Sequence, residues 1–281
     1  MPDRVVVTGA GGYVGRHVVR ALLDQGHHVL AVVRPASRSD VDPRAELIES
    51  DILTPSFDVR SLTHDAPDGV VHLAWQNGFL HNDTSHVMQL SSHFRLLEQF
   101  ADWGVPRLSI LGTMHEVGYW EGPIDEDTPT NPLTLYGIAK DALRKASFVH
   151  LARRTQVQWL RCYYILGDDR NNHSIFTRIL EAVDRGDETF PFTTGKNKYD
   201  FIDVVELADQ IARISTMRGV SGIINTASGI PLSLAERVEA FIAENDLPIA
   251  LEYGAFPDRP YDSPGVWGDT NRTRALLDSS S

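Results

Sequence analysis

The first 165 residues of the chain alternate between short apolar runs and longer amphipathic segments. Apolar runs rich in β-branched residues are typical of strands, and we expect five of them at Arg4–Thr8, Val29–Val33, Val70–Leu73, Leu108–Leu111 and Trp159–Tyr164. The five runs are mostly apolar, as strands are when helices cover both faces of a sheet. The alternation therefore predicts an α/β fold with a doubly wound parallel sheet of the Rossmann type.

The later part of the chain predicts a smaller lobe beside this sheet. Segments 204–214 and 233–244 have helical periodicity, and Ser233 and Glu236 are spaced as a capping box. We expect a sheet domain at 1–166, to which 195–230 returns. Residues 167–194 and 231–281 are expected to form the smaller C-terminal lobe, where a substrate would bind.

Charge and cysteine content restrict the classes of partner. The formal net charge of −12 gives no general attraction to nucleic acid or to anionic membranes. Cys162 is the only cysteine, which excludes an internal disulfide framework and fits a reducing compartment. No apolar run reaches the length of a membrane span. We therefore expect a cytoplasmic protein without a nucleic-acid or membrane partner.

A glycine-rich loop, TGAGGYVG, separates the first expected strand from a helical segment at 13–25. Its glycines are spaced as G-x-x-G-x-x-G, which permits a tight turn and lets backbone amides approach a pyrophosphate at the start of the helix. In this position the motif indicates a dinucleotide-binding site. The candidate residues are Gly9, Gly11, Gly12, Tyr13, Val14 and Gly15.

The end of the second expected strand bears on which dinucleotide binds. A carboxylate that would accept the ribose 2′-hydroxyl of NAD is absent there, because the position is Val33. Arg34, Ser37 and Arg38 follow, and they offer donors suited to a 2′-phosphate. The sequence favours NADP, with NAD possible; alternatively the arginines are ordinary surface charges.

Tyr136 and Lys140 lie four residues apart, so on a helix their side chains share one face. A nearby ammonium stabilises a phenolate, and the pair is therefore expected to lower the pKa of Tyr136. Such a phenol can act as an acid or a base. The alternative is a purely structural pair.

The glycine loop, the strand RLSILGT ending at Thr113, and the pair Tyr136 and Lys140 follow one another as in the short-chain dehydrogenase/reductase superfamily. The chain resembles its extended branch, which contains epimerases, dehydratases and reductases of nucleotide sugars. Further similar segments extend the resemblance to about Arg274: DIL at 51–53, VVHLAW at 70–75, LRCYYILG at 160–167, YDFIDVVELA at 199–208, INTASG at 224–229 and the segment from Arg259.

The resemblance implies roles for individual residues. Tyr136 would be the general acid or base, Lys140 would lower its pKa and hold the nicotinamide ribose, and Thr113 would orient the substrate carbonyl. A homodimer formed through the helix of Tyr136 is also implied. Further cofactor contacts would come from Asp51, Ile52, Leu73, Ala74, Trp75, Tyr163 and Ile165.

The residues after Thr113 separate members of this branch. Dehydratases typically carry an Asp-Glu pair there, whereas this chain has Met114 and His115. The segment is most similar to reductases of nucleoside-diphospho-4-keto-6-deoxyhexoses, and we expect an NADPH-dependent ketosugar reductase. The alternatives are an epimerase that retains its NAD(P) and a non-catalytic dinucleotide-sensing protein.

Some positions depart from the pattern of the branch. Gln89 replaces a common asparagine, Tyr199 a phosphate-binding arginine and Tyr164 a sugar-site asparagine, whereas Arg259 matches the second family arginine. Loop 75–83 follows a strand end, where α/β proteins bind ligands, so it is a candidate pocket wall or else a plain surface loop. The candidate substrate residues are Trp75, Gln76, Asn77, Met114, His115, Tyr164, Tyr199 and Arg259.

The histidines do not match a metal-binding motif. His81, His86 and His93 lack the spacing of H-E-x-x-H or of a Cys/His cluster. We interpret them as the polar face of a helix, and we expect no metal site.

Overall fold

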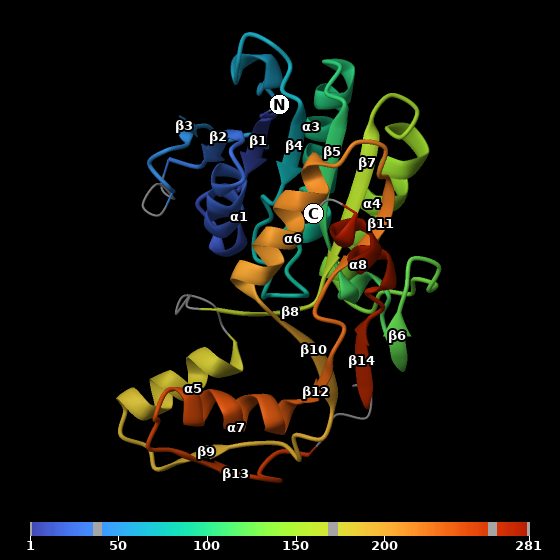
Figure 1. Ribbon diagram of the computed structural model, residues 1–281. Helices are drawn as coiled ribbons and strands as arrows, with labels where there is room; N and C mark the ends of the chain where they lie inside the picture. Colours follow the sequence, from blue (N-terminus) through green and yellow to red (C-terminus); the bar gives the residue numbers. More distant parts are fainter. Residues whose placement is uncertain (1, 36–40, 168–173, 258–262, 280–281) are drawn as a thin grey trace.

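The computed structural model describes residues 2–35, 41–167, 174–257 and 263–279. Its main sheet has seven parallel strands in the order β11-β7-β5-β4-β1-β2-β3 (Figure 1). These are β1 (Arg4–Thr8), β2 (His28–Val33), β3 (Glu46–Glu49), β4 (Gly69–His72), β5 (Arg107–Thr113), β7 (Gln156–Cys162) and β11 (Gly222–Thr226). The predicted doubly wound parallel sheet is confirmed. The apolar run expected at 159–164 continues past β7 into a separate strand, β8 (Tyr164–Leu166).

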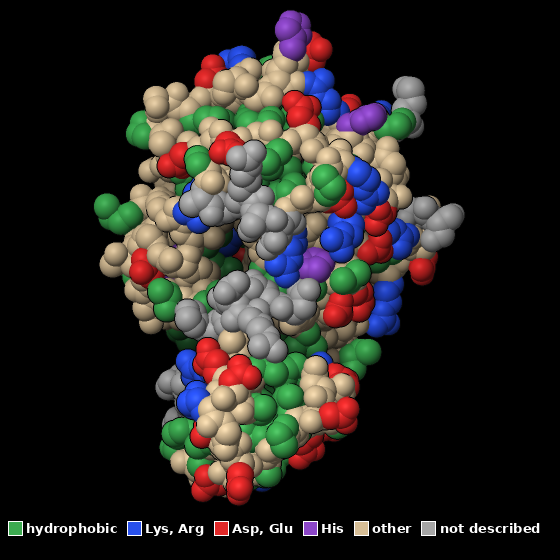
Figure 2. All heavy atoms as spheres, turned by 90° about the vertical axis from the view of Figure 1, so that its left-hand side faces the viewer, with side chains coloured by type: hydrophobic (Ala, Val, Ile, Leu, Met, Phe, Trp, Pro, Cys, Tyr) green, Lys and Arg blue, Asp and Glu red, His purple; other side chains and the backbone are tan. Residues whose placement is uncertain are grey.

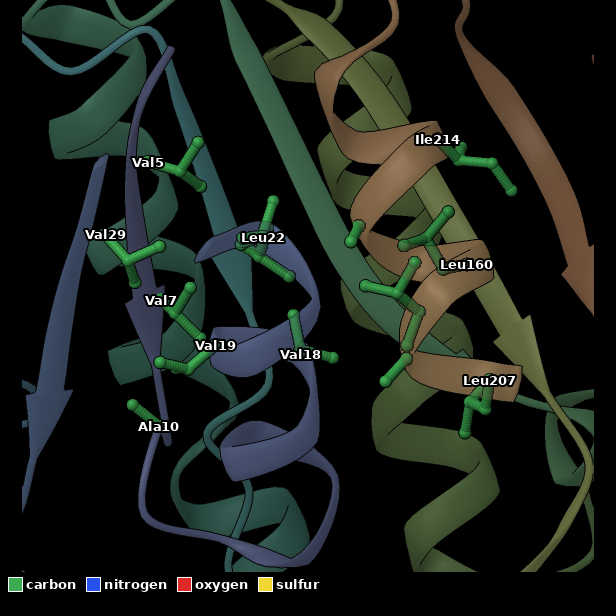
Figure 3. Packing of buried hydrophobic residues seen from close by; sticks show 14 of the residues in the cluster. Val5, Val7, Ala10, Val18, Val19, Leu22, Val29, Leu160, Leu207 and Ile214 are labelled. Atoms are coloured by element: carbon green, nitrogen blue, oxygen red, sulfur yellow. The ribbon is translucent and has the colours of Figure 1, made fainter. Parts of the chain in front are cut away.

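Helices cover both faces of this sheet. On one face lie α1 (Tyr13–Asp24), α6 (Val204–Thr216) and α8 (Asn271–Asp278), and on the other lie α3 (Leu90–Asp102) and α4 (Leu135–His150). Because neighbouring side chains of a strand point to opposite faces, Val5 and Val7 of β1 pack with α1 and α6, whereas Val6 packs with α3 and α4. Figure 3 shows the first of these layers, where Leu22 of α1 and Leu207 of α6 contact the sheet.

A smaller lobe lies beyond the carboxyl ends of the sheet strands (Figure 1). It contains α5 (Ile175–Asp184), α7 (Leu234–Glu244) and the paired strands β9 (Thr189–Pro191) and β13 (Ala250–Glu252). The expected capping box of Ser233 and Glu236 is present at the start of α7. Apolar side chains of these elements form their own core around Phe192 and Val238. In the view of Figure 2 this lobe carries acidic side chains on its outer surface.

A second sheet joins the lobe to the main domain. Its strands run β12 (Pro231–Ser233), β10 (Lys198–Asp203), β14 (Gly265–Gly268) and β6 (Gly122–Ile124), and β8 pairs with β10. Asp200 of β10 is fully buried and accepts four hydrogen bonds, from Ser228 N, Ser228 Oγ, Gly229 N and Gly268 N. One carboxylate therefore fastens β10 to β14 and to the loop that follows β11.

The remaining elements are short: α2 (Ser85–Met88) and two single turns of 3-10 helix at Val59–Ser61 and Met114–Glu116. In the part of the chain that the structure describes, no helix is both long enough and apolar enough to cross a membrane.

Candidate active site

The glycine loop packs β1, α1 and β4 tightly together. Gly9 has φ of 71°, and a Cβ there would lie 2.7 Å from the backbone nitrogen of Ala74. A Cβ on Gly15 would lie 2.1 Å from the carbonyl oxygen of Gly9. Gly12 is the N-cap of α1 and has extended backbone geometry. The loop thus brings the positive end of α1 to the carboxyl edge of the sheet, as a bound pyrophosphate requires.

A cavity of about 140 Å³ opens at this edge. Three of its sides come from the glycine loop, the end of β2 and the end of β4, and the segment after β3 closes the fourth. Its lining residues in the described part of the chain are Gly9, Gly11, Gly12, Val32, Val33, Arg34, Ser50, Asp51, Ile52, Leu53, Leu73, Ala74, Trp75 and Gln76. Its place beside the glycine loop and the ends of β2 and β4 is where α/β proteins of this type bind a dinucleotide.

Half of the expected cofactor residues line this cavity: Gly9, Gly11, Gly12, Arg34, Asp51, Ile52, Leu73, Ala74 and Trp75. Gln76, expected at the substrate, lies here instead, and Val32, Ser50 and Leu53 were not expected. The predicted Ser37 and Arg38 lie outside the described residues, whereas Arg34 is exposed at the rim. The expected residues that do not line the cavity are Tyr13, Val14, Gly15, Tyr163 and Ile165, together with the pair Tyr136 and Lys140.

Thr113, Tyr136 and Lys140 converge at the carboxyl end of β5. Thr113 is the last residue of β5, and its hydroxyl hydrogen-bonds the phenol of Tyr136 near the start of α4. One turn later on the same helix, the buried Lys140 donates from Nζ to the carbonyl oxygen of Leu111 at 2.7 Å. The three side chains that the sequence singled out therefore lie close together at the end of β5.

The expected acidification of Tyr136 by Lys140 is wrong for this structure. Burial raises the pKa of Tyr136, and Lys140 has no part in that shift. The reason is geometric: Nζ of Lys140 lies 6.0 Å from the centre of the phenol ring and bonds Leu111 instead. Burial also lowers the pKa of Lys140 to about 8. Tyr136 is thus a neutral phenol at neutral pH, which is the form that donates a proton.

Trp75 separates the cofactor cavity from Lys140. Nζ of Lys140 lies 3.9 Å from the centre of the indole ring, close enough for a cation–π contact. His93 stacks on the same indole at 4.3 Å between ring centres, and the indole nitrogen donates to Nδ1 of His86 at 3.0 Å. The indole is therefore held in place by two imidazoles.

The interpretation of His86 and His93 as a polar helix face is wrong. Both side chains are buried. His86 contacts Leu80 O through Nε2 at 3.0 Å, and His93 bonds His72, which in turn bonds Thr8 at 2.7 Å. Burial lowers the pKa of His72 to about 3, and it also lowers the pKa of His93. These imidazoles are neutral members of a polar network behind Trp75. In the described ranges, no three His, Cys, Asp or Glu side chains are arranged to hold a metal ion.

A buried ion pair supports the end of β5 from behind. Glu116 and Arg161 are both fully buried, with 2.6 Å between Arg161 Nε and Glu116 Oε1. The indole of Trp159 also donates to Glu116, at 2.8 Å. Burial raises the pKa of Glu116, and the arginine opposes that rise. The pair fixes the turn that carries Met114 and His115.

The expected substrate residues divide into two groups. Met114, His115, Tyr164 and Tyr199 lie together, with 6.3 Å between the ring centres of His115 and Tyr164 and 4.7 Å between those of Tyr164 and Tyr199. Asn77 instead donates to Ser85 on the surface.

Gln76 and Arg259 were also expected at the substrate. Gln76 accepts from Gln89 at 2.8 Å, so the residue that replaces the family asparagine is occupied by a neighbour. Arg259 lies outside the described residues.

Sequence reasoning missed the position of His81. This side chain stacks on the ring of Tyr136, with 5.5 Å between centres and 13° between planes. His81 belongs to a loop without regular structure, so no periodicity in the sequence indicated where its ring would point.

Comparison with known proteins agrees with this geometry. Residues 5–227 match the model of the NAD dependent epimerase/dehydratase family. The chain is 46% identical to dTDP-6-deoxy-L-talose 4-dehydrogenase (NAD(+)) of Aggregatibacter actinomycetemcomitans, over 94% of this chain and 98% of that one. It is 27% identical to dTDP-6-deoxy-L-talose 4-dehydrogenase (NAD(P)(+)) of Kitasatospora kifunensis, over 92% of this chain and 84% of that one.

Solved structures show the same fold. UDP-glucose 4-epimerase of Thermotoga maritima, solved with UDP-glucose, has a TM-score of 0.82 at 22% identity, covering 98% of this chain and 92% of its own. MoeE5 in complex with UDP-glucose and NAD has a TM-score of 0.80 at 25% identity, with the same coverage. The chain belongs to the NAD dependent epimerase/dehydratase family and is a nicotinamide-dependent oxidoreductase of the extended short-chain dehydrogenase/reductase type.

Proposed function

We propose that this enzyme interconverts a hydroxyl and a keto group at carbon 4 of a dTDP-linked 6-deoxyhexose. The observation that carries the proposal is the convergence of Thr113, Tyr136 and Lys140 beside a dinucleotide-shaped cavity. The substrate class is supported by the two relatives at 46% and 27% identity, both named for oxidation of dTDP-6-deoxy-L-talose at carbon 4. Reduction of the 4-ketosugar is the reverse of that reaction, through the same groups.

The side chains supply the proton chemistry. A bound nicotinamide ring gives or accepts the hydride. In reduction, the phenol of Tyr136 donates its proton to the oxygen on carbon 4 and becomes a phenolate; in oxidation, the phenolate form accepts the proton of the carbon-4 hydroxyl. The hydroxyl of Thr113 orients the same oxygen. Lys140, whose ammonium is kept in place by Leu111 and Trp75, would hold the nicotinamide ribose.

Turnover with a substrate panel tests this proposal. Purified enzyme is assayed for NADH and NADPH oxidation with dTDP-4-keto-6-deoxyhexoses, and for NAD(+) reduction with dTDP-6-deoxy-L-talose. We expect turnover that disappears in Tyr136→Phe. Inversion of a nucleotide sugar without net change in cofactor, together with cofactor that stays bound through purification, would instead establish the epimerase alternative, which the more distant relatives named UDP-glucose 4-epimerase also suggest.

The preference between NAD and NADP is part of the proposal. We propose that the enzyme accepts both dinucleotides and that Arg34 determines how well NADP competes. Arg34 lies at the cavity rim near Asp51, and one relative is named for NAD(+) while the other is named for NAD(P)(+). Arg34→Ala is expected to raise the KM for NADP about tenfold and to leave the KM for NAD nearly unchanged, because one charge-assisted contact is removed. Equal KM changes for both cofactors would contradict this role.

We also propose a cytoplasmic homodimer, and we propose that the smaller lobe built from α5, α7, β9 and β13 helps to bind the substrate. Four apolar side chains are exposed on the neighbouring helices α2 and α4: Val87, Met88, Ile138 and Val149. Light scattering after size exclusion tests the dimer. Met88→Asp combined with Val149→Asp is expected to give monomers, whereas Val205→Asp, on the exposed face of α6, is expected to leave the dimer intact. A dimer that survives the double substitution would rule out this interface.

A further inference from the structure

The loop between β4 and α2 is fastened to the start of the catalytic helix. The backbone N–H of Tyr136 donates to the carbonyl oxygen of His81 at 2.9 Å. The preceding N–H, of Leu135, donates to Oδ1 of Asn82 at 3.3 Å. Since a helix leaves its first N–H groups without internal partners, this loop supplies the caps that α4 needs. The position of His81 is therefore fixed relative to Tyr136.

The imidazole of His81 forms part of a ring cluster around the phenol. It lies parallel to the ring of Tyr136, and its centre is 4.3 Å from the centre of the His115 ring. His115 also lies 6.1 Å from Tyr136 and 6.3 Å from Tyr164, between centres. The two imidazoles thus occupy the space between the proton-donating phenol and the aromatic wall at Tyr164.

The ring nitrogens of this pair are left available for a ligand. In the described part of the chain, no hydrogen bond reaches a ring nitrogen of His81 or His115, whereas His72, His86 and His93 all bond protein atoms. Both side chains are only half-buried, and neither appears among the fully enclosed polar groups that lack a partner. Their ring nitrogens are therefore not fully enclosed by the protein.

Both imidazoles are uncharged at neutral pH. Burial lowers the pKa of His115 to about 3, and it lowers the pKa of His81 as well. A neutral imidazole has one N–H donor and one nitrogen acceptor. A sugar hydroxyl likewise donates one hydrogen bond and accepts others, so a pair of such rings is matched to it.

We propose that His81 and His115 together bind the hydroxyl on the carbon next to the reacting carbon of the sugar, and so make that hydroxyl a requirement for turnover. This inference rests on the proposed function. In a 6-deoxyhexose that reacts at carbon 4, the neighbouring free hydroxyl is the one on carbon 3, because carbon 5 carries the ring oxygen and the methyl group. Sites that hydrogen-bond a substrate hydroxyl reject analogues that lack it, because their own polar groups are then left unpaired.

The test compares a dTDP-6-deoxyhexose with its 3-deoxy analogue in the wild-type enzyme and in variants. His81→Phe and His115→Phe keep an aromatic ring and remove its nitrogens. We expect each to lower kcat/KM for the parent sugar by about tenfold or more, as loss of a hydrogen bond with an unpaired partner predicts. With the 3-deoxy analogue, each variant should differ from wild type by less than about threefold. His64→Phe, at an exposed residue far from the cleft, is the matched control and should change neither value.

Two further measurements separate binding from a merely structural role. His81→Asn keeps a donor and an acceptor, so it should retain more of the discrimination between the two sugars than His81→Phe. The dissociation constant for the dinucleotide should be the same in all variants. If one phenylalanine variant fails to fold, as judged by thermal unfolding, the phenylalanine variant of the other histidine carries the comparison.

The outcomes are distinct. Equal losses on the parent sugar and on its 3-deoxy analogue, with an active wild type, would overturn this inference alone. A wild-type enzyme that turns over neither sugar overturns the proposed function and the inference together.

Discussion

At the scale of single residues, Lys140 is held in an environment that does not favour its charge. It is almost fully buried, its ammonium reaches one carbonyl oxygen and the face of Trp75, and the buried Glu116 and Cys162 only partly offset the burial. An ammonium in such a place costs stability in the folded protein. Its retention is typical of a residue kept for function rather than for folding.

Removal of this charge is expected to stabilise the protein. The pKa of Lys140 is about 8 when folded and near its ordinary value of 10.5 when unfolded. Between these values the unfolded chain binds more protons, so the wild type gains stability as pH rises from about 8 to 10.5. Lys140→Met should therefore be more stable than wild type at pH 7 by about 1–3 kcal/mol, and this advantage should shrink at pH 9.5. Urea unfolding at the two pH values measures it, and a variant that is less stable at pH 7 would contradict it.

Residues differ in how far the sequence could predict them. The strand end at Thr113 and the helix face of Tyr136 and Lys140 follow from parallel-sheet topology, so their meeting could be predicted. The pKa of Tyr136 could not, because it depends on where the lysine side chain turns once it is buried. His81 could not be predicted either, because a loop backbone, and no periodic pattern, aims its ring.

At the scale of elements, the start of α4 is the best-fixed part of the candidate site. All three of its first N–H groups have partners: Asn82 for Leu135, His81 for Tyr136, and the hydroxyl of Thr134 for Gly137 at 3.2 Å. Two of these caps come from a loop over 50 residues earlier in the chain. The helix therefore depends on that loop for its first turn.

Loss of the local cap should weaken the helix and the reaction together. Thr134→Ala removes the bond to Gly137, and typical N-cap substitutions cost about 1 kcal/mol. We expect the free energy of unfolding to fall by that amount and kcat to fall more than KM rises, since Tyr136 loses part of its support. Denaturation and steady-state kinetics measure the two effects. Thr134→Ser, which keeps the hydroxyl, should behave as wild type; if it loses as much as the alanine variant, the cap is not the cause.

The elements themselves were mostly predictable. The strand runs expected at 4–8, 29–33, 70–73 and 108–111 all fall within or overlap strands, because buried parallel strands are predominantly apolar. The edge strand β3, with sequence ELIE, was not expected, since it is mostly exposed and carries charges. The burial of His93 in α3 was not predicted. Histidine is a polar residue that usually lies on an exposed helix face, but His93 is buried and bonds His72.

At the scale of the whole molecule, Asp200 is the main polar link between the second sheet and the main domain. Its four donors come from two separate stretches of chain, at 228–229 and at Gly268, and neither can rearrange without leaving an N–H unpaired. The sequence showed Asp200 only as part of a family-like segment. Its partners depend on the way β14 returns beside β10, and only the fold shows this.

Substitution of this carboxylate is expected to be costly. Asp200→Asn keeps the shape but turns an amide N–H₂ toward backbone donors, and an unsatisfied buried group costs about 1–3 kcal/mol each. We expect a loss of about 2–4 kcal/mol in the free energy of unfolding, measured by urea denaturation. Asp203→Asn, at an exposed cap on the same strand, serves as the control and should lose less than about 1 kcal/mol. Comparable losses in the two variants would contradict the special role of Asp200.

Residues 81–82, which accept hydrogen bonds from the first two N–H groups of α4, have two roles in one short segment. The same few residues hold the phenol in register through their backbone and, by our inference, meet the sugar through an imidazole. A graft of this segment from a relative would consequently alter the contact with the sugar hydroxyl and the support of Tyr136 at the same time, so selectivity and proton transfer cannot be changed independently through this loop.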